Sequence, residues 1–402
     1  MTDRSRRAVL ATAGSAVAAI TVAGCLGDDG DGLYEDDDAE SADAMGNATS
    51  ADLASLEADE SAVEATALPI ADPSLPLSYE PEVLREETIS GGVPKDGIPS
   101  IDEPTFQPAT GADSRMDDGD PVFGVEIDGE ARAYPQSILV YHEIVNDDIG
   151  GESVAITYCP LTGTAMGFYR NDVEFGVSGN LVNSNLIMYD REDDSRWPQM
   201  LGTAIDGPLE GASLEEFRIH WVPWERWLEA HPDSEVLTED TGFARDYGSD
   251  PYGAYNPRTR YYEPESEPMF QPLDEDDRHP PKRMTLGARP PEGPLAFDLE
   301  VVAEAGLVAL ELNDRGETNV TTGEAQGGGD AVAQFIAVYE DRLDTVHLYR
   351  GDGDPYAHED GAIVDGDGES HAPGEVPLES VYAYDAMWFA WMGFYPNSIV
   401  VD

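Results

Sequence analysis

The sequence predicts an α+β fold that is dominated by β-structure and built from two related modules. From about Pro69 onward, short apolar runs alternate with Asp-Gly, Pro and Gly breaks, which is typical of short strands joined by turns. The chain contains no glycine-rich phosphate loop and no regular alternation of helices and strands, so a doubly wound parallel sheet is not expected. A tryptophan-containing segment in the middle of the chain is echoed near its end, which predicts the second module.

Residues 125–134 carry the clearest hairpin signal. Apolar and polar residues alternate on both sides of Asp128-Gly129, a dipeptide that two-residue turns favour. A short helix is expected at residues 137–145, and another at residues 224–230 before His231-Pro232. Further strands are expected at residues 153–158, 165–169, 174–177, 186–189 and 217–222.

Two parts of the sequence resemble one another. Residues 224–236 (Trp-Glu-Arg-Trp-Leu-Glu-Ala-His-Pro-Asp-Ser-Glu-Val) are echoed by residues 388–400 (Trp-Phe-Ala-Trp-Met-Gly-Phe-Tyr-Pro-Asn-Ser-Ile-Val). Upstream, residues 154–170 align loosely with residues 332–350. An ancestral duplication would explain both similarities and would give two similar modules. Chance similarity between two tryptophan-bearing helices is the alternative.

We expect five segments along the chain. The length of 402 residues suits one large or two medium domains in addition to an export segment. A signal peptide is followed by an acidic tether, a first β-rich module, a connector rich in Tyr, Pro and Asp, and a second β-rich module. In that order the segments cover residues 1–25, 26–68, 69–240, 241–285 and 286–402.

The charge of the chain is extreme. Acidic residues number 82 against 22 basic ones, which gives a formal net charge of −60, and only Lys95 and Lys282 are lysines. Such a surface repels itself in dilute buffer, whereas molar salt shortens the Debye length to about 3 Å. The composition therefore favours a protein of a salt-in halophilic cell, with a polyacidic binder of cations or basic partners as the alternative. It argues against nucleic acid as a partner, because phosphate binding needs clustered Lys or Arg.

The first 25 residues have the features of an export signal. Arg6-Arg7 stands before an uncharged apolar run at residues 8–23, which is too short and too rich in Ala and Gly for a membrane span. The arginine pair resembles a twin-arginine signal, and residues 22–25 (Val-Ala-Gly-Cys) resemble a lipobox. We therefore expect lipidation of Cys25 and anchoring of the chain to membrane lipid on the outer face of the cell. A plain signal peptide with an incidental cysteine is the alternative.

The segment at residues 26–68 is rich in Asp, Glu, Ala, Gly and Ser and nearly free of large apolar residues. It cannot bury enough surface to offset its ordering entropy, so we expect a disordered tether. Its Asp-rich run at residues 28–38 lacks the spacing and the closing Glu of a calcium loop, which favours a solvated run of charge. Weak glycosylation signals stand at Asn47 and Asn319.

The segments richest in chemically useful side chains lie in the first module. Residues 141–147 read Tyr-His-Glu-Ile-Val-Asn-Asp, and residues 156–165 read Ile-Thr-Tyr-Cys-Pro-Leu-Thr-Gly-Thr-Ala. Residues 179–191 read Gly-Asn-Leu-Val-Asn-Ser-Asn-Leu-Ile-Met-Tyr-Asp-Arg. These segments resemble the domain of unknown function 3179 family, as do residues 245–252 and the closing aromatic segment. The resemblance covers roughly residues 80 to 402 and implies no particular activity.

Thr162 is a departure from the resemblance. Many members of that family have a second cysteine at this place, and a Cys-x-x-Cys pair would suit a redox dithiol or half of a metal site. If lipid consumes Cys25, then Cys159 is the only free thiol of the mature chain. An intrachain disulfide and a thiolate-rich zinc site are then excluded.

Three interpretations of Cys159 stay open. It is a small buried hydrophobe at a strand end, or it is one ligand of a mixed site with His142 and Glu143, where thiolate and imidazole would suit a single copper or zinc ion. In the third interpretation it is a catalytic nucleophile whose thiolate is favoured by His142, with backbone amides of the next turn holding an oxyanion. His142 taken alone fits a structural role better than a ligand role.

A polar cluster follows on one predicted strand and its turn, formed by Asn183, Asn185, Tyr189, Asp190 and Arg191. Because side chains alternate along a strand, the cluster would provide one polar wall of a ligand site. In the alternative, the asparagines satisfy loop backbone, and Asp190–Arg191 is a surface ion pair of little energetic value. The six tryptophans are expected in the core and not on a sugar-binding platform.

Three functions are compatible with these features. A lipid-anchored protein that captures a small molecule or a metal for a membrane partner protein ranks first, because of the anchor, the tether and the polar cluster. A thiol-dependent enzyme using Cys159 with His142 ranks second. A structural component of the cell envelope ranks third.

Overall fold

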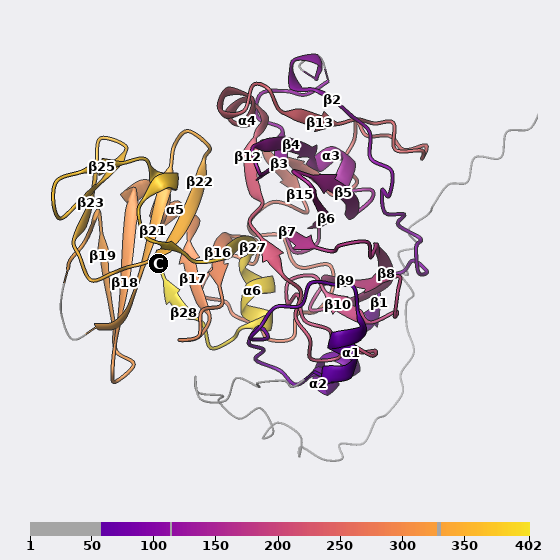
Figure 1. The fold of residues 1–402 in the computed structure, drawn as a ribbon, viewed down its shortest axis with the longest axis horizontal. Coiled ribbons are helices and arrows are strands. Elements are labelled where there is room, and N and C mark those ends of the chain that lie inside the picture. Colours follow the sequence, from indigo (N-terminus) through magenta and orange to yellow (C-terminus); the bar gives the residue numbers. More distant parts are fainter. Residues whose placement is uncertain (1–57, 113–114, 328–330) are drawn as a thin grey trace, which may run out of the picture. The chain divides into compact units, whose positions relative to one another are not determined.

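The structure of the chain is a computed structural model, and it describes residues 58–112, 115–327 and 331–402 (Figure 1). Within these residues, the strands β1 to β28 make up most of the regular structure, with the helices α1 to α6 between them. The predicted β-dominated α+β class is therefore confirmed. The signal peptide, Cys25 and most of the predicted tether lie outside the described residues.

The chain between the predicted tether and the first sheet contains two short helices. Helix α1 (Glu60–Ala65) lies inside the segment predicted as tether, and its first turn is capped by Asp59, whose carboxylate accepts from Ser61 N (2.9 Å). Helix α2 (Pro81–Glu86) follows. Leu68 is buried against the core of the first module.

The first module contains a five-stranded sheet with the order β12-β3-β4-β13-β2. Its strands are β2 (Phe106–Pro108), β3 (Pro121–Ile127), β4 (Glu130–Pro135), β12 (His220–Pro223) and β13 (Glu235–Leu237). Asp128 and Gly129 both have positive φ at the β3–β4 turn, so the hairpin predicted from this dipeptide is confirmed. Helix α4 (Trp224–Ala230) joins β12 to β13, which confirms the helix predicted there.

A second sheet of this module has the order β11-β7-β6-β5. Its strands are β5 (Ile144–Ile149), β6 (Glu152–Cys159), β7 (Thr164–Tyr169) and β11 (Glu216–Phe217). The helix predicted at residues 137–145 is wrong over most of its length, because α3 covers only Gln136–Leu139. The chain turns at Glu143 and then pairs along all of β5 with β6, and this ladder outweighs the local helical pattern.

A third sheet has the order β1-β8-β9-β10 and contains two of the predicted strands. Its strands are β1 (Ile89–Ser90), β8 (Phe175–Val182), β9 (Asn185–Asp190) and β10 (Arg196–Pro198). In the connector, the regular structure is a small hairpin of β14 (Gly253–Tyr255) and β15 (Arg258–Arg260).

The second module has three sheets, with the orders β27-β16-β17-β28, β19-β18-β21-β22-β26 and β20-β23-β24-β25. Its helices are α5 (Leu299–Ala305) and α6 (Trp388–Phe394). Its strands are β16 (Met284–Ala288), β17 (Leu295–Asp298), β18 (Leu307–Asn313), β19 (Thr318–Thr322), β20 (Glu324–Ala325), β21 (Ala331–Glu340), β22 (Thr345–Arg350), β23 (Tyr356–Glu359), β24 (Ala362–Asp365), β25 (Ser370–His371), β26 (Glu379–Ser380), β27 (Ala383–Met387) and β28 (Ile399–Val401).

The two modules share a strand order. In each, a hairpin (β3–β4 or β16–β17) is flanked by an antiparallel strand (β12 or β27) and by a parallel strand (β13 or β28), and a helix (α4 or α6) joins the flanking strands. A short helix follows each hairpin (α3 or α5) and leads into further antiparallel strands, β5 to β7 or β18, β21 and β22. The indole of each joining helix donates to a serine, Trp227 to Ser234 (3.1 Å) and Trp391 to Ser398 (2.8 Å).

Glycine makes room for a tryptophan at the same place in both modules. The ring of Trp227 lies over Gly124, and the ring of Trp391 lies over Gly287. A Cβ atom at Gly124 would lie 2.2 Å from the first ring, and one at Gly287 would lie 2.1 Å from the second. Five of the six tryptophans are buried, as expected: Trp197, Trp224, Trp227, Trp388 and Trp391.

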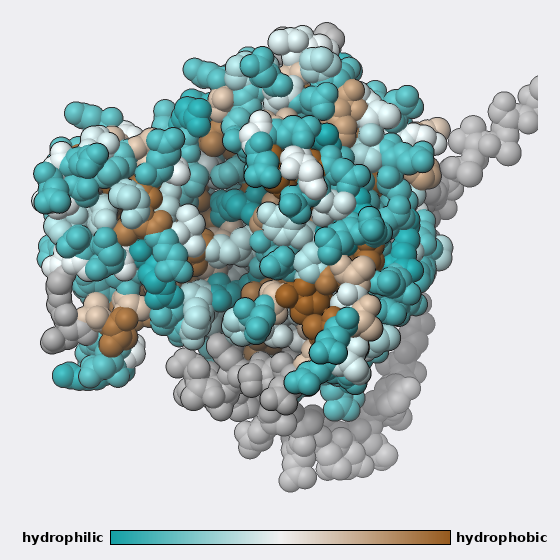
Figure 2. All heavy atoms as spheres, in the orientation of Figure 1, coloured by the Kyte–Doolittle hydropathy of each residue, from teal (hydrophilic) through white to brown (hydrophobic). Residues whose placement is uncertain are grey.

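Hydrophilic residues cover most of the face of the molecule drawn in Figure 2, with small separate hydrophobic areas between them. None of the helices in the described ranges has the length and apolar character that a membrane span requires.

Gly124→Ala and Gly287→Ala are each expected to destabilise the fold. The added methyl group would meet a fully buried tryptophan ring, and overpacking of this kind costs about 1–3 kcal/mol. Gly111→Ala is the control, because the nearest atom to its new Cβ lies 4.0 Å away. Thermal unfolding in molar KCl measures all three variants, and equal melting temperatures for the three would contradict the packing described here.

Candidate functional site

Cys159 is the last residue of β6 and is buried. Its Sγ accepts from the backbone N–H of Leu186 (3.4 Å) and lies 3.8 Å from the carbonyl oxygen of Ser184, to which the thiol donates. Burial raises the pKa of the thiol to about 11, and the nearby Glu143 carboxyl contributes to the rise. Cys159 is therefore a protonated thiol at neutral pH, which opposes the nucleophile interpretation, because the thiolate is the reactive form.

The loop after Cys159 is closed by two other parts of the chain. The hydroxyl of Tyr261, in the connector, donates to the carbonyl oxygen of Leu161 (2.7 Å). The backbone N–H of Met387, in the second module, donates to the carbonyl oxygen of Thr162 (2.9 Å). These contacts join the turn that was predicted to supply an oxyanion hole to the connector and the second module, and Leu161 and Thr162 are buried there.

His142 does not form a pair with Cys159. One ring nitrogen, Nδ1, lies 2.7 Å from the carbonyl oxygen of Pro99, and the other, Nε2, lies 2.7 Å from the hydroxyl of Tyr247. The side chain is fully buried, and burial lowers its pKa, so the imidazole is neutral. Because both ring nitrogens have hydrogen-bond partners, His142 fits a structural role better than the role of a metal ligand or a base.

Glu143 is the most unusual residue of these segments. It has a φ of 60°, which is uncommon for a residue with a side chain, and only 7% of its surface is exposed. Its carboxyl group forms no hydrogen bond with any residue that the structure describes. Burial raises its pKa to about 8, so it carries a proton at neutral pH. A strained and buried carboxylic acid is a frequent property of functional sites.

The connector covers this region with tyrosines. Tyr252 lies near both Glu143 and Cys159, and burial together with these two groups raises the pKa of its phenol. Lys282 holds two parts of the connector together, since its ammonium group donates to the carbonyl oxygens of Tyr261 (2.6 Å) and Glu267 (3.0 Å) and lies over the Tyr261 ring. Lys282 is fully buried, which lowers its pKa to about 8.

A cleft of about 470 Å³ opens between the first module and the connector. The carboxylate of Asp250 stands at its wall and accepts from Gln136 Nε2 (2.8 Å) and from the Tyr262 hydroxyl (2.9 Å). The backbone N–H of Tyr252 donates to the other oxygen of Asp250 (2.7 Å). Tyr247, which holds His142, also lines the cleft. His142, from one of the predicted motif segments, is thus connected to the cleft through Tyr247 of the connector.

The charge of the cleft is negative. Four carboxylates line it against a single guanidinium group, that of Arg115. The carboxylates belong to Asp117, Asp120, Glu239 and Asp250. Such a lining suits a polar ligand that carries hydrogen-bond donors or positive charge.

A buried polar network surrounds the turn after Cys159. The Oγ1 atom of Thr162 accepts from Asn185 Nδ2 (3.1 Å) and lies 2.8 Å from Thr164 Oγ1. Gln199 Oε1 accepts from Thr164 (2.7 Å) and from Asn185 (3.0 Å), while its Nε2 donates to Thr157 Oγ1 (3.0 Å). The network is satisfied from within, so Asn185 and Thr162 have structural roles here.

The other residues of the predicted polar wall also bond to protein groups. Asn183 donates to the carbonyl oxygen of Ala390 in α6 (2.7 Å) and accepts from the N–H of Leu273 (2.9 Å), so it joins three parts of the chain. Tyr189 donates to the carboxylate of Asp96 (2.7 Å).

Asp190 and Arg191 do not pair with each other. The buried Asp190 carboxylate accepts from Ser195 N (3.0 Å) and from Trp197 Nε1 (3.0 Å). Arg191 contacts Asp102 (2.8 Å) and Glu174 (2.5 Å). None of the five residues of the predicted wall lines the cleft.

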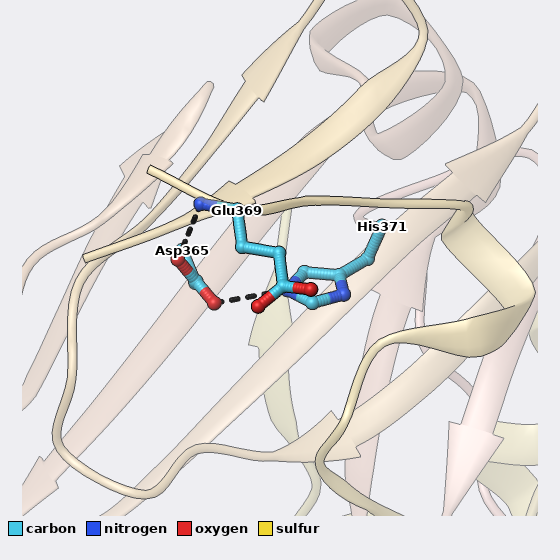
Figure 3. A group of neighbouring side chains, drawn as sticks. All are labelled: Asp365, Glu369 and His371. Atoms are coloured by element: carbon cyan, nitrogen blue, oxygen red, sulfur yellow. Dashed lines mark hydrogen bonds and ion pairs between the residues drawn. The ribbon is translucent and has the colours of Figure 1, made fainter. Parts of the chain in front are cut away.

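Among the described residues, one group of three side chains has the spacing of metal ligands, and it lies outside the first module. The ligand atoms of Asp365, Glu369 and His371 are all within 4.8 Å of one another at the β24–β25 hairpin (Figure 3). Asp365 already accepts from the N–H of Glu369 (2.9 Å) and lies 2.9 Å from His371 Nε2, so these contacts are those of a stabilised turn. Cys159, His142 and Glu143 do not form such a group, so the structure does not support a copper or zinc ion there.

The comparisons with known proteins place the chain in a family. The family described as Protein of unknown function (DUF3179) matches residues 95–398. The chain belongs to the DUF3179 family. No curated protein and no solved structure gave a match. The match covers most of both modules and the whole connector, and with them the residues that line the cleft.

Sequence reasoning missed the residues that shape the cleft. Gln136 lies just outside the helix predicted at residues 137–145, and Tyr247 and Asp250 lie in the segment at residues 245–252 that resembles the family. Gln136 and Asp250 meet across 114 positions of the chain, which no local pattern reveals. The available signal was the clustering of Tyr, Asp and Pro in the connector.

Glu143 is expected to make stability depend on pH. Its pKa rises from 4.5 in the unfolded chain to about 8 in the folded protein, so the folded state binds the proton more tightly. Stability is then highest below pH 4.5 as far as this group is concerned, and it falls as pH rises towards about 8. At about 1.4 kcal/mol for each pKa unit, the full loss is on the order of 5 kcal/mol.

Glu143→Gln removes this dependence. Chemical unfolding of both proteins between pH 5 and pH 9 in molar KCl should show the variant gaining stability over the native protein as pH rises. Glu229→Gln, at an exposed position of α4, is the control and should follow the native curve. Parallel curves for the native protein and Glu143→Gln would show that Glu143 is ionised in the folded state.

Proposed function

We propose that this protein is a lipid-anchored, outward-facing binding protein that captures a small polar ligand in the cleft beside Asp250. The observation that carries the proposal is the cleft itself, a cavity of about 470 Å³ whose wall is held in place before any ligand arrives. Its volume lies within the range of about 300–1,000 Å³ that is typical of small-molecule sites.

The geometry of Asp250 supports this proposal. Both carboxylate oxygens are oriented by protein donors, from Gln136, Tyr262 and the backbone of Tyr252. A carboxylate fixed in this way needs no reorganisation when a ligand binds, which reduces the entropic cost of association. Together with the other carboxylates of the cleft, it favours a ligand with ammonium or hydroxyl groups, or a hydrated divalent cation.

The proposed address of the protein rests on its sequence. The twin-arginine pair, the short apolar run and the lipobox ending at Cys25 support export followed by lipid anchoring. The net charge of −60 supports a working environment of concentrated salt. A protein at this location would pass its ligand to a membrane protein, which is the partner that we propose. The shared strand order of the modules supports an origin by duplication.

A second candidate function is acid–base catalysis, and Glu143 is the observation that favours it. A carboxylic acid with a pKa of about 8 can donate a proton near neutral pH, as general acids of many enzymes do. In this case Glu143 replaces Cys159 and His142 as the group with a chemical role. Nuclear magnetic resonance of a bound ligand over time separates the two functions, because only an enzyme would consume it, and Glu143→Gln would stop the consumption.

Titration calorimetry in molar KCl tests ligand capture. The ligands are four classes with donor groups or positive charge: amino acids, sugars, polyamines and divalent metal chlorides. One class should give saturable heat, and Asp250→Asn should weaken its affinity at least about tenfold, because a charged hydrogen-bonding partner is removed. Glu229→Gln is the control and should bind like the native protein. Absence of saturable heat with all four classes, or equal affinity for Asp250→Asn, would contradict the proposal.

The anchor is tested by Cys25→Ala in the cell that makes the protein. Loss of the lipid should release the folded protein into the medium, because the lipid is the proposed attachment to the membrane. Replacement of Arg6-Arg7 by two lysines should instead keep the protein inside the cell. Detection in membrane, medium and cytoplasmic fractions measures both outcomes, and membrane retention of Cys25→Ala would refute the anchor.

A further inference from the structure

A second cavity, of about 350 Å³, lies where the connector and the two modules meet. We name it the junction cavity. Trp221 of β12 and Tyr255 of the connector line one part of it, and Met284 and Leu299 of the second module line another. It is separate from the cleft beside Asp250, although Tyr255 lines both. Nothing in the proposed function uses this cavity.

Two polar groups of the junction cavity stand without partners in the described part of the chain. Thr345 is 5% exposed, and its Oγ1 atom is buried without a hydrogen bond. The Oδ1 atom of Asp385 is also buried without a hydrogen bond. The nearest cation is Arg218, whose Nη2 atom is 4.0 Å from Asp385 Oδ1, and that guanidinium group already donates to the carbonyl oxygens of Ala383 and Val346.

Groups of this kind cost stability as long as they stay unpaired. A buried donor or acceptor without a partner costs about 1–3 kcal/mol, and most are therefore satisfied in native proteins. Asp385 and Thr345 line one cavity, so both belong to the wall that a single ligand would contact. The remaining lining combines aromatic and aliphatic side chains with Arg258, Glu300 and Asp344, which suits an apolar body that carries a positively charged group.

We propose that the junction cavity is a second ligand site, which takes a small primary amine with an apolar or aromatic body. The ammonium group donates to the Asp385 carboxylate and to the Thr345 hydroxyl. The body lies against Trp221, Tyr255 and Leu299, where the aromatic rings also attract the positive charge. A neutral ligand would leave Arg218, 4.0 Å away, as the nearest cation to the partly buried Asp385 carboxylate.

The correspondence between the modules gives the site an origin. From the strand registers, Met284 and Leu299 of the second module are equivalent to Pro121 and Gln136 of the first. Pro121 and Gln136 line the cleft, so each module has a cavity beside the same part of its hairpin. Exchange of the amide of Gln136 for the aliphatic side chain of Leu299 changes the expected ligand from a polar solute to an apolar amine.

The test uses phenethylamine as the probe and the full chain in molar KCl, with calorimetry and tryptophan fluorescence as readouts. Phenethylamine should bind saturably and alter the emission, since Trp221 lines the cavity. Phenethyl alcohol, which has the same body without the charge, should bind at least about tenfold more weakly. Near-uv circular dichroism confirms that each variant below is folded.

Asp385→Asn should weaken phenethylamine at least about tenfold, and Thr345→Val should weaken it by a smaller factor, because the hydroxyl contributes an uncharged hydrogen bond. Asp360→Asn, at an exposed position with a positive φ that Asn accepts, is the matched control and should bind like the native protein. If Asp385→Asn fails to fold, Thr345→Val decides. Absence of saturable binding, or affinities that neither variant changes, would overturn the proposal without touching the cleft beside Asp250.

Discussion

A buried ion pair joins the two modules. Arg289, at the end of β16, donates through Nη2 to both carboxylate oxygens of Glu216 in β11 (2.6 and 2.7 Å). Its Nη1 atom donates to the carbonyl oxygens of Met200 (3.2 Å) and Leu201 (2.7 Å). Only 2% and 5% of the two side chains are exposed, so neither charge has water as an alternative partner. Removal of either side chain would leave the other charge buried without a partner, which would lower the free energy of unfolding by about 3–5 kcal/mol.

Arg289 and Arg218 join the second module to the first, and Asn183 donates a hydrogen bond to α6. Gln136 donates to Asp250 and Tyr141 donates to Ser249, and these contacts hold the connector against the first module. The cleft and the junction cavity lie at the borders of the connector. The arrangement explains why the thiol of Cys159 is shielded and why the residues with ligand-binding geometry come from the connector and from module borders.

Local chemistry predicted the fold better than it predicted the site. The Asp128-Gly129 turn and the repeated tryptophan helices depend on residues close in sequence, and the structure contains both. The helix expected at residues 137–145 was wrong because β5 pairs with β6, and Glu143 turns the chain before that ladder begins. The sequence did not reveal the partners of His142, whose ring nitrogens lie beside the Pro99 carbonyl oxygen and the Tyr247 hydroxyl. The cleft could not be predicted from the sequence, because Gln136 and Asp250 come together only when the connector is folded.

The central claim is that the Arg289–Glu216 pair holds the two modules in the arrangement that forms the junction. A double-mutant cycle with Arg289→Met and Glu216→Leu tests it through the free energy of unfolding in urea at molar KCl. Each single variant should lose about 3–5 kcal/mol, and the double variant should recover most of that loss, because no unpaired charge remains buried. Single variants that lose less than about 1 kcal/mol, or a double variant that loses the sum of both, would contradict the claim.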